Sequence, residues 1–316
     1  MALQAVTPAA AAVSWVVPPL ASSAYKGQAG KIAVLGGCAE YTGAPFYAAL
    51  SALKLGADLS HVFCDAQAAV PIKSYSPELI VHGCLSASNS VDAAECERQA
   101  QEVTKWFGAL SGLVVGPGLG RDPTLQAVAA IVVKQAVAAS LPCVIDADGL
   151  RLVMEDPQIV HGSRWTVLTP NKPEYERLIA QLCPSSTEGE VAQLLKLTRG
   201  LGGPTLVRKG PVDLICDGQV VLANEEPGCP KRSGGQGDVL AGSIATMLSW
   251  ARAGEGRMPA GVHADGYSAP ALATWGACLL TRRFSARAFH QRRRSMTAPD
   301  LIEAIGPVFE EFAPAV

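Results

Sequence analysis

Residues 231–248, KRSGGQGDVLAGSIATML, place three glycines, a glutamine and one aspartate directly before an apolar run with helical periodicity. A helix N-terminus presents unpaired N–H groups and the positive end of the helix dipole, and glycines let the backbone approach an anion closely. The stretch therefore predicts a turn that enters a helix and binds a phosphoryl group. It is not a Walker A loop, because no G-K-[ST] follows the glycines.

Asp238 is the only acidic residue of this stretch, and a bare carboxylate would repel a phosphate. It suits a general base that takes a proton from a hydroxyl group while nearby N–H groups stabilise the charge that develops on the phosphate. The alternative role is a helix cap, which aspartate often provides.

Outward from this stretch, short apolar runs alternate with longer helical patterns such as residues 44–57, 125–139 and 188–198. Continuous Val/Ile/Leu runs that end in Gly, Asp or Asn predict a parallel sheet covered on both faces, and therefore an α/β fold. The DG in DLICDGQVVLAN (213–224) predicts a β-hairpin. The expected parallel strands are KIAVLGG (31–37), LSHVFC (59–64), ELIVH (78–82), LVVGPG (113–118), CVIDADG (143–149), TVLTPN (166–171) and TLVRKG (205–210).

The 316 residues contain no repeat and no stretch that resembles a linker, so we expect one domain over 13–316 after a disordered, Ala-rich tail at 1–12. A net charge of -2 gives no general attraction to nucleic acid, and no apolar run is long enough to predict a membrane helix. Nine scattered cysteines without a C-x-x-C pair favour a reducing compartment over a zinc site or disulfides. The first 25 residues carry no charge, which favours the cytoplasm and leaves mitochondrial or plastid targeting open.

Ligands bind beyond the carboxyl ends of the strands in open α/β sheets, so the polar residues there are candidates. Asp146 and Asp148 suit a metal–phosphate site or, more simply, helix caps. Asn171, Glu174 and Arg177 could hold a polar substrate or form a capped helix with an ion pair. Lys209 suits a phosphate contact or a solvated surface position.

Two further segments are ambiguous. VVGPGLG (114–120) lacks the spacing and the acidic residue of the Rossmann fingerprint, and is either a ligand-binding turn or a plain strand-to-helix turn. TRRFSARAFHQRRR (281–294) holds six arginines that could meet nucleic acid or a polyphosphate, although a solvated helix face is the simpler reading.

Together, KGQAGKIAVLGGCAEYTGAP, GPGLGRDP, VIDADGL, LTPNKPEYERL, VRKGPVDLI and GGQGDVLAGS resemble, in order and spacing, the NAD(P)H-hydrate dehydratases, which repair nicotinamide nucleotides and have a ribokinase-like fold. NKPEYER and the segment from WGACLL to the C-terminus resemble the eukaryotic branch, which uses ATP. The resemblance implies a three-layer α/β/α sandwich. It also implies ATP-dependent dehydration of the S epimer of hydrated NADH and NADPH (NADHX and NADPHX).

By this resemblance, Asp238 prepares the ring hydroxyl for phosphoryl transfer from ATP with Mg²⁺, and the backbone of residues 234–237 holds the phosphate. No residue is assigned to the metal. The implied substrate site contains Gly120, Asn171, Lys172, Pro173, Glu174, Tyr175, Glu176, Arg177 and Asp238. The implied ATP site contains Lys209, Gly210, Pro211, Val212, Asp213, Gly228, Cys229, Pro230, Lys231, Arg232, Ser233, Gly234, Gly235, Gln236 and Gly237.

Two other functions compete with this one. A kinase of the same fold that phosphorylates a vitamin-precursor alcohol could use the same glycine-rich turn, but it would not carry GGCAEYTGAP and NKPEYER. A non-catalytic nucleotide- or RNA-binding module would have no need of Lys209, Asn171 and Asp238. The resemblance also leaves open a homo-oligomer and a functional pairing with an NAD(P)H-hydrate epimerase. Residues 251–270 look like a Gly-rich insertion, for which we expect a surface loop.

Overall fold

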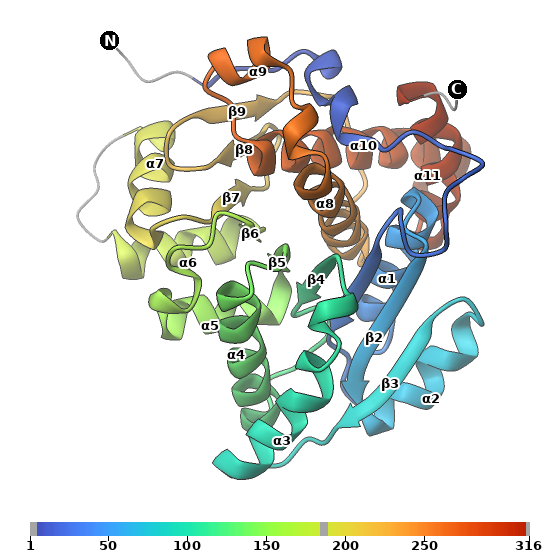
Figure 1. The fold of residues 1–316 in the computed structure, drawn as a ribbon, viewed down its shortest axis with the longest axis vertical. Helices are drawn as coiled ribbons and strands as arrows, with labels where there is room; N and C mark the ends of the chain where they lie inside the picture. Colours follow the sequence, from blue (N-terminus) through green and yellow to red (C-terminus); the bar gives the residue numbers. More distant parts are fainter. Residues whose placement is uncertain (1–4, 184–188, 314–316) are drawn as a thin grey trace.

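A single nine-stranded sheet forms the centre of the computed structural model, which describes residues 5–183 and 189–313 (Figure 1). The strand order is β3-β2-β1-β4-β5-β6-β7-β8-β9, in which β1 to β7 pair in parallel and β7, β8 and β9 pair antiparallel. The strands are β1 (Lys31–Leu35), β2 (Leu59–Asp65), β3 (Ile80–Leu85), β4 (Gly112–Val115), β5 (Cys143–Ile145), β6 (Thr166–Leu168), β7 (Thr205–Arg208), β8 (Asp213–Cys216) and β9 (Val221–Asn224). The predicted parallel strands and the hairpin at 213–224 are confirmed.

Helices cover both faces of this sheet. The α-helices are α1 (Gly43–Leu55), α2 (Ala66–Tyr75), α3 (Ala93–Thr104), α4 (Pro123–Ala138), α5 (Leu150–Glu155), α6 (Lys172–Leu182), α7 (Glu190–Leu201), α8 (Gln236–Ala253), α9 (Ala260–Ala264), α10 (Ala269–Arg292) and α11 (Ala298–Phe312). Short 3₁₀ helices lie at Ala10–Val16, Phe107–Ala109, Ala147–Gly149, Pro157–Val160, Glu255–Arg257 and Arg293–Ser295. Among the residues that the structure describes, no helix is both long and apolar enough to cross a membrane.

Two hydrophobic cores result, one on each face of the sheet. Alternate residues of one strand point to opposite faces, so Val34 of β1 belongs to the core that also contains residues of α1, α8, α10 and α11, while Leu35 belongs to the core that contains residues of α3, α4 and α5. The strands are apolar throughout because both faces are covered, as the sequence predicts. The expected three layers, helices–sheet–helices, are confirmed.

Two segments differ from expectation. Within the tail expected at 1–12, Val6 forms a bridge to Leu222 of β9, and a 3₁₀ helix begins at Ala10. The Val6 N–H donates to the Val221 carbonyl (2.9 Å), and the Val6 carbonyl accepts from the Ala223 N–H (2.8 Å), so backbone pairing places this segment. Residues 1–4 lie outside the described part of the chain. Residues 251–270 are largely helical, because they contain the end of α8, a 3₁₀ turn, α9 and the beginning of α10.

Candidate active site

The glycine-rich turn leads into α8, as predicted. Gly235 is the N-cap residue of α8 and has a φ of 89°, in the left-handed region that favours glycine. A Cβ at this position would clash with Ala298 and lie 2.9 Å from the Tyr47 ring. Among the residues that the structure describes, no side chain caps α8, so the helix-cap role considered for Asp238 is not the one observed. The N-terminal N–H groups of α8 therefore keep their capacity to bind an anion.

Asp238 lies in the first turn of α8 and is partly buried. Burial, reinforced by the negative charge of Asp146 and partly offset by Lys209, raises the pKa of Asp238 to about 7. A general base works best when its pKa lies near the pH at which the enzyme operates. This carboxyl group can thus exchange a proton with a substrate near neutral pH.

Asp146 follows β5 and is almost completely buried, with 3% of its surface exposed. Its Oδ1 accepts hydrogen bonds from the Thr169 hydroxyl (2.6 Å) and from Nζ of Lys209 (3.1 Å). Burial alone would lower the pKa of Lys209, but Asp146 and more distant carboxylates raise it above its ordinary value. Lys209 is therefore a fixed positive charge next to Asp238.

Asp146 does not act as the helix cap that its position suggested, since it makes no side-chain cap hydrogen bond. In the sequence, the signal that Asp146 belongs to a site was its position directly after a predicted strand. Its neighbour Asp148 accepts a hydrogen bond from the Gly120 N–H (2.9 Å).

Gly120 lies in the turn after β4, where the strand order reverses between β1 and β4. Such reversal points are ligand-binding crevices in α/β sheets. The turns after β1 and β4 meet here, because the Gly37 N–H donates to the Gly118 carbonyl (3.1 Å). The N–H of Gly120 is already bonded to Asp148, so it is not free to bind a ligand. Because glycine has no side chain, a ligand can still approach the backbone closely at this position.

The segment NKPEYER begins α6 with a capping box. Oδ1 of Asn171 accepts from the Glu174 N–H (3.0 Å), and Oε2 of Glu174 accepts from the Asn171 N–H (2.7 Å). Burial raises the pKa of Glu174, although the Asn171 N–H and Lys209 act in the opposite direction. Within the described residues, Glu174 and Arg177 do not form the ion pair considered above. Instead, Nζ of Lys172 lies 3.8 Å from Oε1 of Glu176.

The members of this segment point in different directions. Tyr175 packs into the core that contains α4 and α5, so its side chain does not reach the site. Asn171 and Lys172 line a cavity between the end of β7, the beginning of β8 and the helices α8 and α10, which is the main cavity of the site. The exposed residues Pro173, Glu176 and Arg177 do not line it.

The main cavity has a volume of about 920 Å³ and lies between the end of β7, the beginning of β8, the segment after β9 and the helices α8 and α10. Most of the predicted ATP-site residues line it: Lys209, Gly210, Pro211, Asp213, Gly228, Cys229, Pro230, Arg232, Ser233, Gln236 and Gly237. The predicted residues Val212, Lys231, Gly234 and Gly235 belong to the same segments but do not line the cavity.

Helix α10 supplies a further wall of the cavity, part of which belongs to the arginine-rich segment 281–294, for which a polyphosphate contact was one alternative. Cys278, Thr281, Arg282 and Ser285 line the cavity, and their spacing places them on one face of the helix. Arg282 belongs to the arginine-rich run and forms an ion pair with Asp213 (2.6 Å). Other arginines of the run pair with acidic residues: Arg283 with Glu226, Arg287 with Glu311 and Arg292 with Asp300.

This geometry combines a carboxyl group of near-neutral pKa, a fixed lysine and an anion-binding helix N-terminus beside a cavity of nucleotide size. The family model of NAD(P)H-hydrate dehydratase matches residues 32–307. The chain belongs to the NAD(P)H-hydrate dehydratase family.

A curated member of this family, the ATP-dependent (S)-NAD(P)H-hydrate dehydratase of Vitis vinifera, is 46% identical over 309 residues, which cover 95% of this chain and 86% of the relative. This identity agrees with the resemblance to the eukaryotic branch.

Two solved structures share the fold at lower identity. A ribokinase-like superfamily protein of Enterococcus faecalis superposes with a TM-score of 0.74 at 20% identity, over 99% of this chain and 98% of that one. The ADP/ATP-dependent NAD(P)H-hydrate dehydratase of Bacillus subtilis, co-crystallized with ATP/Mg²⁺, gives 0.67 at 18% identity, over 98% and 100%. The predicted ribokinase-like fold is confirmed.

Proposed function

We propose that the residues described above serve one reaction, the ATP-dependent dehydration of the S epimer of hydrated NADH and NADPH. The chain is an ATP-dependent (S)-NAD(P)H-hydrate dehydratase, like its curated relatives. The observation that carries the assignment of the residues is Asp238, whose pKa of about 7 occurs at the beginning of a helix with no capping side chain.

Asp238 is the general base of the phosphoryl transfer. The hydroxyl oxygen of the hydrated ring attacks the γ-phosphorus of ATP, Asp238 takes the hydroxyl proton, and ADP leaves. The phosphorylated ring then loses inorganic phosphate and a ring proton, and the double bond of NAD(P)H forms again. One hydrate and one ATP thus give NAD(P)H, ADP, phosphate and one proton.

The nucleotide occupies the cavity between β7, β8, α8 and α10. The N–H groups at the beginning of α8 bind the transferred phosphate, for which the glycines leave space. Lys209 lines the cavity and contributes a positive charge that Asp146 holds in place. The ATP-site residues that do not line the cavity, among them Gly235, shape the backbone of its walls.

The residues present fit a magnesium ion that accompanies ATP. Mg²⁺ is usually bound by one or two carboxylates together with phosphate oxygens and water. Oδ2 of Asp146 lies 3.7 Å from an ideal Cβ position on Gly237 and so faces the glycine-rich turn. Within the described residues, no cluster of three or more acidic, His or Cys side chains could hold a metal, so the phosphates would supply most of the ligands. Asp146 would hold the ion, and the bound ion would neutralise part of the phosphate charge.

The hydrated nicotinamide lies between Asp238, the turn at Gly120 and the beginning of α6. Asn171 and Lys172 offer polar contacts at the edge of the cavity. Glu174 orients Asn171 through the capping box, and Tyr175 anchors α6 in the core. Pro173, Glu176 and Arg177 stay predictions for this substrate site.

The test is to incubate the purified chain with the separated epimers of hydrated NADH in the presence of ATP and Mg²⁺, and to follow recovery of the reduced-nicotinamide absorbance. Recovery from the S epimer, with release of stoichiometric ADP and phosphate, is expected. Accumulation of a phosphorylated product without phosphate release would instead identify a kinase. Omission of ATP or its replacement by ADP measures nucleotide choice, and a tenfold preference for ADP would contradict the proposal.

Several further expectations stay predictions. These are a single domain over 13–316, a homo-oligomer, a functional pairing with an epimerase, no nucleic-acid or membrane partner, and a cytoplasmic location.

A further inference from the structure

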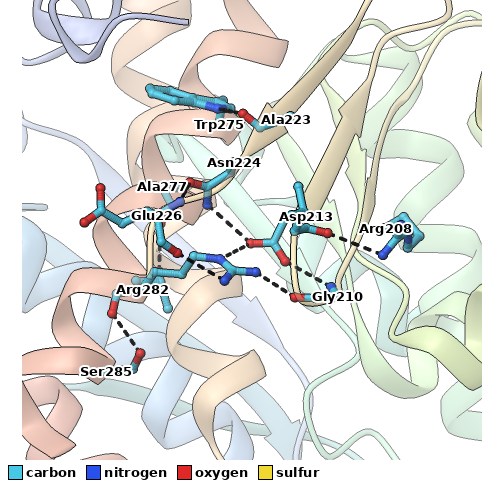
Figure 2. Close-up of polar contacts among 12 residues, drawn as sticks. Arg208, Gly210, Asp213, Ala223, Asn224, Glu226, Trp275, Ala277, Arg282 and Ser285 are labelled. Atoms are coloured by element: carbon cyan, nitrogen blue, oxygen red, sulfur yellow. Dashed lines mark hydrogen bonds and ion pairs between the residues drawn. The ribbon is translucent and has the colours of Figure 1, made fainter. Parts of the chain in front are cut away.

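Arg282 of α10 bonds to two segments that line the nucleotide cavity, one after β7 and one after β9 (Figure 2). Its Nε donates to Oδ2 of Asp213 (2.6 Å), and a terminal nitrogen donates to the Gly210 carbonyl (2.7 Å). The other terminal nitrogen donates to the Glu226 carbonyl (3.2 Å). One guanidinium group therefore joins the segment after β7 to the segment after β9.

Asp213 completes the network from the other side. Its Oδ1 accepts from the Gly210 N–H (3.1 Å), and its Oδ2 also accepts from Nδ2 of Asn224 (3.3 Å). The network is well shielded from solvent, since the side chains of Arg282 and Asp213 are 16% and 10% exposed. Hydrogen bonds of this kind, between charged groups with restricted access to water, hold their partners in one geometry.

We propose that Arg282 is a positioning residue for ATP, which holds the segments after β7 and β9 in the arrangement that the nucleotide requires. The proposal rests on the assignment of this cavity to ATP in the preceding subsection. Gly210, Asp213, Glu226 and Arg282 all line the cavity, so a displacement of any of them changes its shape.

The chemistry of the side chain explains why arginine is needed here. The guanidinium group is planar and can donate in three directions at once, whereas the ammonium group of lysine is a compact point charge on a flexible chain. Three of the five N–H groups of Arg282 donate to Asp213, Gly210 and Glu226, which fixes the guanidinium group against these segments. We therefore assign Arg282 a role through these segments and not on the reacting atoms.

The decisive comparison is between Arg282→Gln, Arg282→Lys and Arg287→Gln. Arg287 is the matched control, since it lies on the same helix and pairs with Glu311 but does not line the cavity. Arg282→Gln removes charged hydrogen bonds that hold the lining segments, so we expect it to raise the KM and Kd of ATP by about 10- to 100-fold. The values of kcat at saturating ATP and of KM for the hydrate should change little. For Arg282→Lys, the KM and Kd of ATP should lie between those of wild type and Arg282→Gln. For Arg287→Gln, both constants should equal those of wild type.

Folding and binding are separated by measuring the Tm of each variant with and without ATP. If Arg282→Gln does not fold, Asp213→Asn breaks the same network and should weaken ATP binding in the same direction. If folded Arg282→Gln has an unchanged Kd for ATP while Lys209→Gln binds ATP more weakly than wild type, the positioning role of Arg282 is wrong and the assignment of the cavity to ATP still holds. If Lys209→Gln also binds ATP normally, the assignment of the cavity to ATP is wrong, and the role of Arg282 is wrong with it.

Discussion

Replacement of Asp238 by Asn keeps the size of the side chain and removes its ability to accept a proton. A positioned general base contributes about 10²–10⁴-fold to a rate, so kcat should fall by about that factor. The affinity for ATP should stay the same or increase, because a negative charge beside the bound phosphates is removed. A helix-capping residue would tolerate this change, since an asparagine caps as well as an aspartate.

The same substitution should stabilise the protein above neutral pH. The pKa of Asp238 is raised from the ordinary 3.8 to about 7 in the folded state, so the folded protein holds a proton that the unfolded chain has lost between these values. The stability of the wild type therefore falls as the pH rises through this window. At about 1.36 kcal/mol per pKa unit, the cost of the ionised form above pH 7 is at most about 4 kcal/mol. Asparagine does not ionise and avoids this cost.

The assay is urea unfolding of wild type and Asp238→Asn at several values between pH 4 and pH 8, together with kcat at saturating substrate. The difference in the free energy of unfolding should grow in favour of the variant as the pH rises. A difference that is constant across this range would refute the burial argument for the raised pKa. A variant that keeps more than about a tenth of the wild-type kcat would show that the base lies elsewhere.

Three further predictions concern other residues. Gly242→Ala should destabilise the protein although alanine favours helices, because the new Cβ would clash with the Ala48 carbonyl oxygen of α1. Gly200→Ala in α7 is the control, since outside its chain neighbours and its own helix backbone no described atom lies within 4 Å of the new Cβ; it should be neutral or stabilise by up to about 1 kcal/mol, as thermal unfolding can show. Burial, assisted by the charges of His82 and Lys31, lowers the pKa of His61 to about 4, so the free energy of unfolding should fall as the pH decreases from about 6.5 to 4. Urea unfolding of His61→Phe should show a smaller fall over the same pH range. Lys209→Gln removes a charge that lowers the pKa of Asp238, so the acidic limb of the kcat/KM profile should move above pH 7; an unmoved limb would contradict the coupling.

Features with local causes could be predicted from the sequence. The strand at Lys31–Leu35 was predicted because Val, Ile and Leu occupy both faces of a covered sheet, and the hairpin was predicted because DG favours its turn. The entry into α8 was predicted because glycines precede an apolar run with helical periodicity, and the structure shows that one of them, Gly235, takes a left-handed φ.

Features that depend on distant contacts could not be predicted. Asp146 and Lys209 are 63 residues apart and meet only because β5, β6 and β7 are neighbours in the sheet. Arg282 could not be distinguished from the other arginines of its run, since its partner Asp213 lies 69 residues away. The direction of Tyr175 into the core likewise depends on how α6 rotates against the sheet.

The backbone bridge between Val6 and β9 has a practical consequence for handling the protein. β9 ends the sheet, and an uncovered terminal strand presents N–H and carbonyl groups that can pair with another chain and lead to aggregation. Val6 satisfies the Val221 carbonyl and the Ala223 N–H, while the Trp275 indole N–H donates to the Ala223 carbonyl (2.7 Å). Recombinant versions that begin after residue 9 would leave part of this strand open, so preparations for assay should retain the N-terminal segment and carry any affinity tag at the other end.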